Sequence, residues 1–240
     1  MPNGSLEEWL HPSDRQEQRH LNLIQRVNIV LDIANALDYL HNLCHASLAH
    51  CDLKSSNILL DTDMTAHVGD FGLARILPLA ISHPFSSNRQ ANSSKTSSIG
   101  IRGAIIGYAA PKYGMGSEES TFGDVYSYGI LLLELFTGKI PTNDMLKDGF
   151  SLHKFPLTAS PNRVKEIFYP TILFQRDERS RNIMNYYQSQ LQRFQECLIF
   201  TVNIGVSCSI EEPRNRMNMV DVVAELKHIR DKLLVTKFKQ

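Results

Sequence analysis

Residues 50–57, within the stretch AHCDLKSSNILLD, combine acidic, basic and amide side chains that could act together in catalysis. Asp52 is a carboxylate that could orient and deprotonate a hydroxyl nucleophile, and Lys54 is an ammonium that could offset charge on a transferring phosphoryl group. Asn57 and Asp70, the second of which opens the triplet DFG, offer the oxygen atoms that Mg²⁺ prefers as ligands. These residue types, in this order, predict phosphoryl transfer.

The scaffold around these residues is predicted to be helical, with one small β-hairpin. Apolar residues recur at helical spacing between Leu23 and Leu40, which predicts a long helix over Leu21–Leu43 with one apolar face. Two short apolar runs, Asn57–Asp61 and Ala66–Val68, flank a polar turn and predict the hairpin. The candidate residues would then lie in the loops at the two ends of this hairpin.

Further helices are predicted near the start of the chain and in its second half. The sequence SLEE at residues 5–8 has the pattern of a capping box that opens a short helix. Residues Val125–Thr137 are apolar on nearly all sides, which predicts a buried helix that Gly138 ends. Helical spacing also predicts helices over Leu191–Val206 and Met219–Leu234. Almost no strand is predicted beyond the hairpin.

The composition favours an ordinary globular protein in a reducing compartment. A chain of 240 residues with 42% apolar residues can bury a sizeable core. Lys+Arg and Asp+Glu total 25 each, so the net charge of zero favours neither nucleic acid nor an anionic membrane as a partner. The four cysteines lack Cys-x-x-Cys spacing and are too few for a disulfide framework. No signal-peptide pattern or bilayer-spanning apolar run is present, so this chain is expected to be soluble.

The catalytic stretch belongs to a longer pattern of motifs. Residues 50–57 match H-R-D-L-x-x-x-N at every fixed position except Arg, where Cys51 stands, and DFG follows at the distance a hairpin would take. With MPNGSLEEWLH, GYAAPKYGMG, GDVYSYGILLLELFTGKIPT and PRNRMNMVDVVAEL, the chain resembles the C-terminal lobe of a protein Ser/Thr kinase. It is most similar to plant leucine-rich-repeat receptor-like kinases, and Cys51 resembles their "non-RD" branch, which is associated with innate immune receptors.

The resemblance implies a role for each candidate residue. Asp52 resembles the catalytic base, and Lys54 resembles the lysine that contacts the phosphate. Asn57 and Asp70 resemble the metal ligands, and Leu59 looks like the floor of the adenine pocket. ATP and Mg²⁺ are therefore the implied ligands, and a Ser or Thr hydroxyl of a protein is the implied substrate.

The resemblance also implies a fold with one half of the site missing. Residues 1–240 would form one domain of the mainly α kinase C-lobe, a helical bundle with a small β-hairpin, and residues 70–112 would be the activation segment. Asp124 resembles the buried Asp that braces the catalytic loop. Met1 would lie at the hinge, so the N-terminal β lobe, with its Gly-rich loop, strand Lys and helix Glu, would be missing. The chain alone is therefore expected to be inactive.

Three departures from the family pattern also favour an inactive chain. The segment Gly103–Tyr108 carries one residue more than the family's Gly-Thr-Ile-Gly-Tyr and lacks its Thr, which puts substrate docking in doubt. Lys112 stands where the family has a Glu that pairs with an Arg, and Arg216 resembles that Arg. Loss of one partner of a buried pair typically costs about 3–5 kcal/mol. Pro156 falls where the family continues a helix.

Two functions from different classes fit the sequence. The first is a receptor-like Ser/Thr kinase domain that needs its N-lobe to transfer the ATP γ-phosphoryl group. The second is a non-catalytic, pseudokinase-like interaction module or a decayed gene product, which could bind other receptor-like kinase domains through an exposed apolar surface. Either way the chain is expected to be cytoplasmic, whereas a longer parent would lie at the plasma membrane with this domain on the cytosolic side.

Several residues also have a purely structural interpretation. His50 and His67 could form a transition-metal site with nearby carboxylates, but packed histidines in a loop are favoured. Cys51 could be a reactive thiol, but no basic neighbour is visible in the sequence, which favours an inert one. The Ser-rich residues 86–98 predict a loop that is either phosphorylated or simply solvated.

Overall fold

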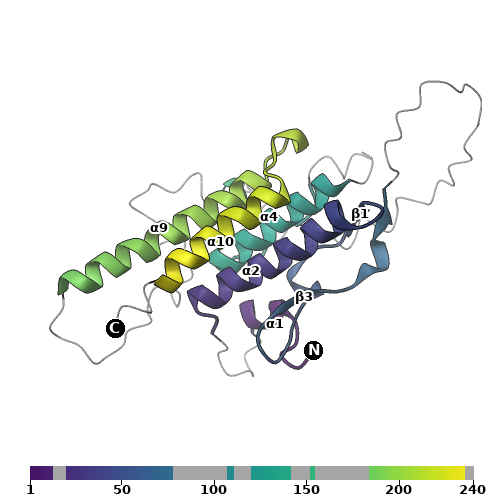
Figure 1. Ribbon diagram of the computed structural model, residues 1–240. Helices are drawn as coiled ribbons and strands as arrows, with labels where there is room; N and C mark the ends of the chain where they lie inside the picture. The colour runs from purple at the N-terminus through teal and green to yellow at the C-terminus, as the bar shows by residue number, and fades with distance from the viewer. Residues whose placement is uncertain (13–19, 78–106, 111–119, 142–151, 155–183, 236–240) are drawn as a thin grey trace, which may run out of the picture.

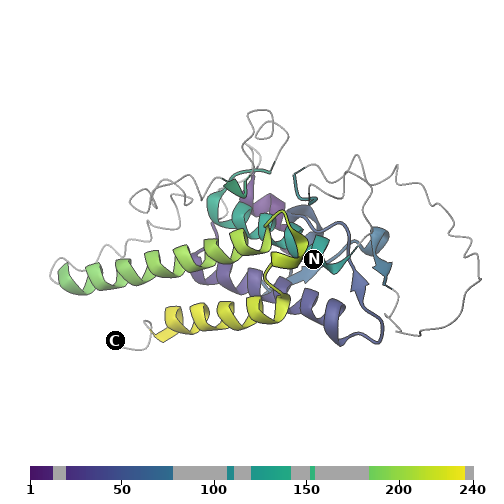
Figure 2. The same cartoon turned by 90° about the horizontal axis from the view of Figure 1, so that it is seen from above.

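The computed structural model describes residues 1–12, 20–77, 107–110, 120–141, 152–154 and 184–235, and only the helical backbone of 184–191 (Figure 1). Four long helices pack side by side, and the two views agree on this bundle (Figures 1 and 2). They are α2 (Leu23–Asp38), α4 (Thr121–Thr137), α9 (Met184–Cys208) and α10 (Met219–Val235). The predicted loop 86–98 and the positions Lys112 and Pro156 lie outside the described residues.

Helix α2 confirms the predicted long amphipathic helix, with a boundary set by its cap. The Asn22 side chain accepts a hydrogen bond from the backbone N of Gln25 at 2.9 Å, and Gln25 Oε1 accepts one from the backbone N of Asn22. This reciprocal capping box starts the helix at Leu23, two residues later than predicted. At its far end the chain continues as one π-helical turn, Tyr39–Leu43, which carries His41 toward the candidate site.

Helix α4 is the buried centre of the bundle, as its nearly uniform apolar sequence predicted. It begins at Thr121, four residues earlier than predicted, and every residue from Asp124 to Thr137 is buried. Gly138 ends it with a φ of +70°, and its N–H donates to the carbonyl of Glu134 at 2.8 Å. Glycine adopts this left-handed conformation at no steric cost, which explains the predicted stop.

The remaining helices follow the predicted pattern with shifted ends. The short helix α1 (Leu6–Leu10) opens with the predicted capping interaction, in which Glu8 accepts a hydrogen bond from the backbone N of Ser5 at 3.0 Å. Helix α10 matches its predicted range to within one residue, whereas α9 extends seven residues further toward the N-terminus than predicted. The residues added to α9 are largely polar, so apolar spacing could not reveal them.

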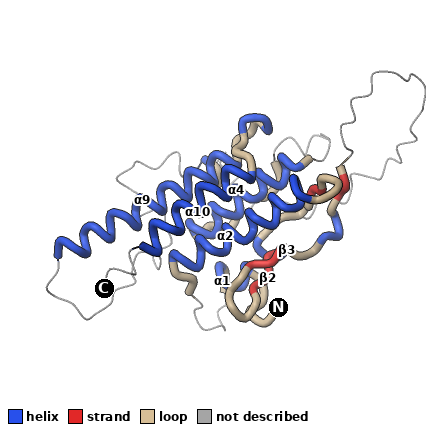
Figure 3. The backbone as a smooth tube through the Cα atoms, viewed as in Figure 1, coloured by secondary structure: helices blue, strands red, loops and turns tan. Residues whose placement is uncertain are grey.

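The described strands are short and lie to one side of the bundle, as the red segments of Figure 3 show. Strands β2 (Ile58–Leu60) and β3 (Ala66–Val68) form the predicted antiparallel hairpin, in register Ile58 to Val68. A second antiparallel pair, β1 (Leu48–Ala49) with β4 (Arg75–Ile76), was not predicted. This pair joins the chain before the catalytic stretch to the chain after DFG, so it closes a loop around both motifs.

Candidate active site

Three of the predicted site residues meet at the carboxylate of Asp52. Its Oδ2 atom accepts hydrogen bonds from Lys54 Nζ at 2.9 Å and from Asn57 Nδ2 at 3.0 Å. The same Asn57 amide also donates to the backbone carbonyl of Asp52 at 2.9 Å. The Asp52 side chain is only 6% exposed, and its Oδ1 atom has no hydrogen-bond partner within the described parts of the chain. One carboxylate oxygen is thus fixed by neighbours, and the other is buried without a hydrogen-bond partner among the described residues.

The carboxylate of Asp124, on helix α4, is hydrogen-bonded to the backbone at the start of the catalytic loop. It accepts hydrogen bonds from the backbone N atoms of His50 at 2.7 Å and Cys51 at 2.9 Å. His41 Nε2 approaches the same carboxylate at 2.9 Å. Cys51 has a φ of +66°, so this contact helps to fix a backbone conformation that is uncommon outside glycine. Sequence reasoning identified Asp124 but missed His41, whose only signal was a polar residue on an otherwise apolar helix face.

Asp70 is tied to the same loop through its neighbour Gly69. The N–H of Gly69 donates to the carbonyl of Asn57 at 2.8 Å, and His50 Nε2 lies 2.9 Å from the carbonyl of Gly69. Asp70 itself has a φ of +58° and accepts a hydrogen bond from the backbone N of Gly72. Asp70 is exposed, whereas Asn57 is buried, so the two predicted metal ligands lie on linked backbone segments at different depths.

Leu59 lies on the hairpin strand β2 and borders this turn. A Cβ atom built on Gly69 would lie 3.4 Å from Leu59 Cδ1, so the leucine side chain covers the backbone just before Asp70. Leu59 is half-buried. Its backbone pairs with His67 in the hairpin and forms an isolated antiparallel β-bridge with Ser5, at the start of α1. Its apolar side chain is therefore at the edge of the site, next to the residue pair predicted to hold the metal.

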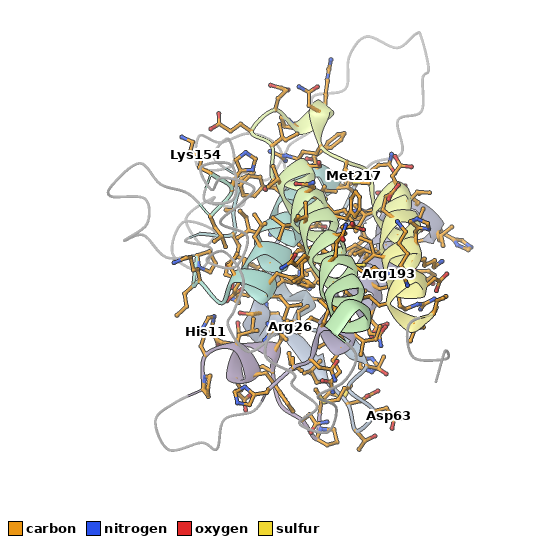
Figure 4. All side chains as sticks on the ribbon, turned by 90° about the vertical axis from the view of Figure 1, so that its left-hand side faces the viewer. His11, Arg26, Asp63, Lys154, Arg193 and Met217 are labelled. Atoms are coloured by element: carbon orange, nitrogen blue, oxygen red, sulfur yellow. The ribbon has the colours of Figure 1, made fainter. Side chains whose placement is uncertain are left out.

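A second buried carboxylate, Glu134 on α4, lies beside the catalytic loop. His11 Nε2 is 2.9 Å from its Oε1 atom, Ser55 Oγ donates to the same oxygen at 3.2 Å, and the Tyr108 hydroxyl donates to Oε2. Burial raises the pKa of Tyr108 well above its usual value, and the adjacent carboxylate raises it further, so the hydroxyl keeps its proton. Figure 4 labels His11, which follows α1. Sequence reasoning did not identify His11, Ser55 or Glu134 as site residues.

The histidines of the site region have ordinary partners. His50 contacts the Gly69 carbonyl and the edge of the Phe71 ring, whose centroid is 4.9 Å from its own. His67 pairs instead with Asp61 at 2.9 Å on the exposed face of the hairpin. Across the described ranges, no group of three or more His, Cys, Asp or Glu side chains is arranged to hold a metal ion. The predicted Mg²⁺ site differs in kind, because it relies on one amide, one carboxylate and phosphate oxygens.

Comparison with known proteins identifies the family to which the chain belongs. The family model described as protein tyrosine and serine/threonine kinase matches residues 1–226. The chain belongs to this kinase family. It is 46% identical over 235 residues, 96% of its length, to the receptor-like protein kinase At3g47110 of Arabidopsis thaliana. It is also 44% identical over 235 residues to the receptor kinase-like protein Xa21 of Oryza sativa subsp. japonica, across 97% of the chain.

A third relative extends the match over nearly the whole chain. The leucine-rich-repeat receptor-like serine/threonine-protein kinase EFR of Arabidopsis thaliana is 40% identical over 243 residues, which cover 99% of the chain. The chain spans about a fifth of the length of these relatives, namely 20–22% of each. It is thus a part of a kinase domain of the plant receptor-like class, with the mainly helical fold of the C-lobe. In the portions that the structure describes, no helix is both long and apolar enough to cross a bilayer.

The kinase pattern predicted an unfavourable Lys112 at the position of the Glu that pairs with Arg216. The structure describes the hydrogen bonds that the Arg216 guanidinium makes. Arg216 donates to the carbonyls of Phe122 at 2.6 Å, Ile210 at 2.7 Å and Glu211 at 3.0 Å. Its guanidinium carbon also lies 5.0 Å from the centre of the Tyr126 ring. Carbonyl oxygens therefore meet much of the hydrogen-bonding demand of this buried cation.

Proposed function

We propose that the chain is the catalytic-loop half of a receptor-like protein Ser/Thr kinase domain, which transfers the γ-phosphoryl group of ATP to Ser or Thr hydroxyls. The observation that carries this proposal is the geometry at Asp52. Lys54 and Asn57 hold one carboxylate oxygen, and the buried Oδ1 atom has no partner among the described residues. A buried carboxylate oxygen is costly to leave unsatisfied, so the unsatisfied Oδ1 atom supports a hydroxyl of the substrate as its donor.

The proposed roles follow from the chemistry of each side chain. Asp52 would accept a hydrogen bond from the attacking hydroxyl and orient it, and finally take its proton. Lys54, whose Nζ atom is already fixed on Asp52, would offset negative charge on the phosphoryl oxygens. Cys51 cannot form the ion pair with a phosphorylated activation segment that an Arg at this position would form. We therefore expect the activity of the complete domain not to depend on such a pair.

The residues present fit Mg²⁺ and ATP. Asn57 and Asp70 carry oxygen ligands on backbone segments that the hydrogen bond from Gly69 N to Asn57 O joins directly. Mg²⁺ keeps few protein ligands and completes its octahedron with water and phosphate oxygens, so two such residues suffice. When bound, the ion would neutralise charge on the phosphates. Leu59 would offer an apolar surface to the adenine ring next to this pair.

Phosphoryl transfer needs more than these residues provide. The 240 residues contain no G-x-G-x-x-G segment, the motif of the loop with which kinases cover the phosphates. Because phosphoryl transfer depends almost entirely on positioning and electrostatic stabilisation, we expect transfer only when a segment that supplies this loop is joined to the chain. The longer receptor would lie at the plasma membrane, with this domain on the cytosolic side.

A second candidate function is a non-catalytic interaction module. Its support is the exposure of apolar side chains around the site: Phe71 is 46% exposed, Leu43 66% and Ile76 72%. Exposed apolar surface of this kind favours a protein partner, such as another receptor-like kinase domain. This function does not require nucleotide, so nucleotide binding distinguishes the two.

The deciding experiment is calorimetric titration of the folded chain with Mg·ATP. We expect weak binding that is lost in Asp70→Ala and kept in Asp63→Ala, a matched control at an exposed turn on the other end of the hairpin. Circular dichroism would check that each variant is folded. A folded wild-type chain that binds no Mg·ATP would overturn the kinase proposal and favour the interaction module.

A further inference from the structure

Glu134 joins three parts of the chain that are far apart in sequence. Its side chain is 1% exposed, and its donors are His11, Ser55 and Tyr108, which come from the end of α1, the catalytic loop and the segment before α4. The Ser55 and Tyr108 hydroxyls also lie 3.1 Å from each other. The three donors therefore meet at one buried carboxylate, and two of them also lie next to each other.

Ser55 connects this cluster to the residues proposed to act on the phosphate. It follows Lys54 directly and opens the 3₁₀ turn Ser55–Asn57. The N–H of Asn57 closes that turn on the carbonyl of Lys54 at 3.0 Å, and the N–H of Ile58 donates to the carbonyl of Ser55. A shift of Ser55 would thus move Lys54 and Asn57 relative to Asp52.

His11 is the outermost member of the cluster. Its side chain is 17% exposed, and its backbone N–H closes the last turn of α1 on Glu7 at 2.8 Å. Among the three donors to Glu134, only His11 can carry a positive charge, whereas the high pKa of Tyr108 keeps that residue neutral. A buried carboxylate that loses one of its donors is strongly destabilised, so the position of Glu134 depends on His11.

We propose that His11 is a positioning residue for the catalytic loop, acting through Glu134 on Ser55 and Tyr108. The inference rests on the proposed function, because it takes Lys54 and Asn57 as the groups that are positioned. It assigns to α1 a role that its sequence does not predict: His11, at the end of the helix, holds the catalytic loop against α4. The proposal concerns the geometry of the loop before nucleotide binds, so it can be tested without activity.

The test is hydrogen exchange measured by NMR on the 240-residue chain without nucleotide. His11→Ala should speed exchange at the amides of Asn57 and Ile58 about tenfold, the effect of losing one hydrogen bond to a buried charged group. It should also shift the ¹³C signal of the Tyr108 ring carbon that carries the hydroxyl. His11→Gln retains an Nε2 donor and should restore both readouts to within about twofold of wild type.

The control variant is Tyr128→Phe, which removes a different buried hydrogen bond of α4, from the Tyr128 hydroxyl to the carbonyl of Val30. It should lower global stability and leave both readouts unchanged. Unchanged exchange in His11→Ala, equal changes in Tyr128→Phe, or no rescue by His11→Gln would each overturn the proposal. If His11→Ala does not fold, His11→Asn replaces it, because its amide is too short to reach Glu134. Exchange is measured without nucleotide, so failure of Mg·ATP binding remains a separate result.

Discussion

Gly129 on α4 lies directly against Gly205 on α9, and the absence of both side chains lets the two helices pack closely. A Cβ atom on Gly129 would lie 2.7 Å from the Gly205 carbonyl oxygen and 2.9 Å from the backbone N of Ser209. A Cβ atom on Gly205 would instead meet side-chain atoms of Leu132 and Leu133 at 2.9 Å. Backbone atoms cannot yield as side chains can, so the two glycines are not equivalent.

This difference predicts unequal effects of two alanine substitutions. Gly129→Ala should lower the free energy of unfolding by about 3 kcal/mol, because α9 must move away from α4. Gly205→Ala should cost about 1 kcal/mol, because the leucine side chains can adopt other rotamers and alanine favours the helix. Urea unfolding would measure both, with the exposed Lys227→Ala on α10 as the control. Equal costs for the two glycine variants would show that the close helix contact is wrong.

His41 is expected to stabilise the catalytic loop through Asp124. His41→Ala should lower the free energy of unfolding by about 2 kcal/mol, because the buried Asp124 carboxylate then loses one of its three described donors. His67→Ala removes an exposed histidine–aspartate pair and should have a much smaller effect. Chemical denaturation of both variants gives the comparison. A cost for His41→Ala as small as that for His67→Ala would contradict the buried contact.

How much of the structure the sequence predicts depends on how far apart in sequence the interacting residues lie. Helices α2 and α4 and the hairpin follow from local periodicity, and the motif spacing identified Asp52, Lys54 and Asn57, which the structure brings together. The pair β1–β4 was missed because two-residue strands have no period to detect. The contact of His41 with Asp124 spans 83 residues and that of His11 with Glu134 spans 123, so only the fold creates them.

The four cysteines should divide into two classes of reactivity. Cys197 and Cys208 are buried, and burial raises the pKa of Cys208 to about 12 and that of Cys197 above its usual value. Cys44 and Cys51 are half-exposed. Because the thiolate is the reactive form, a thiol reagent should modify Cys44 and Cys51 in the native chain and the other two only after unfolding. Mass spectrometry with Cys44→Ser and Cys51→Ser would assign the fast sites, and native modification of Cys208 would contradict its burial.

The carboxyl groups of Asp32 and Asp61 should affect the pH dependence of stability in opposite directions. Burial raises the pKa of Asp32 above 3.8, although its hydrogen bond from the backbone N of Ala66 at 3.1 Å partly offsets this effect. The folded state then binds the Asp32 proton more tightly than the unfolded state, so this group reduces stability as pH rises above 3.8 through its folded pKa. For Asp61, the hydrogen bond with His67 lowers the pKa, so its contribution is present above 3.8 and is lost as pH falls through the lower folded value.

Asparagine substitutions separate these two contributions. Asp32→Asn keeps an acceptor for Ala66 and removes the charge, so it should stabilise the protein relative to wild type at about pH 6 and have a smaller effect near pH 3.5. Asp61→Asn should destabilise the protein at the higher pH, with a deficit that shrinks as the pH falls. Urea unfolding in steps across this range would measure both differences, because each variant is compared with wild type at the same pH. If both variants differed from wild type in the same direction at about pH 6, burial would not be what governs the pKa of Asp32.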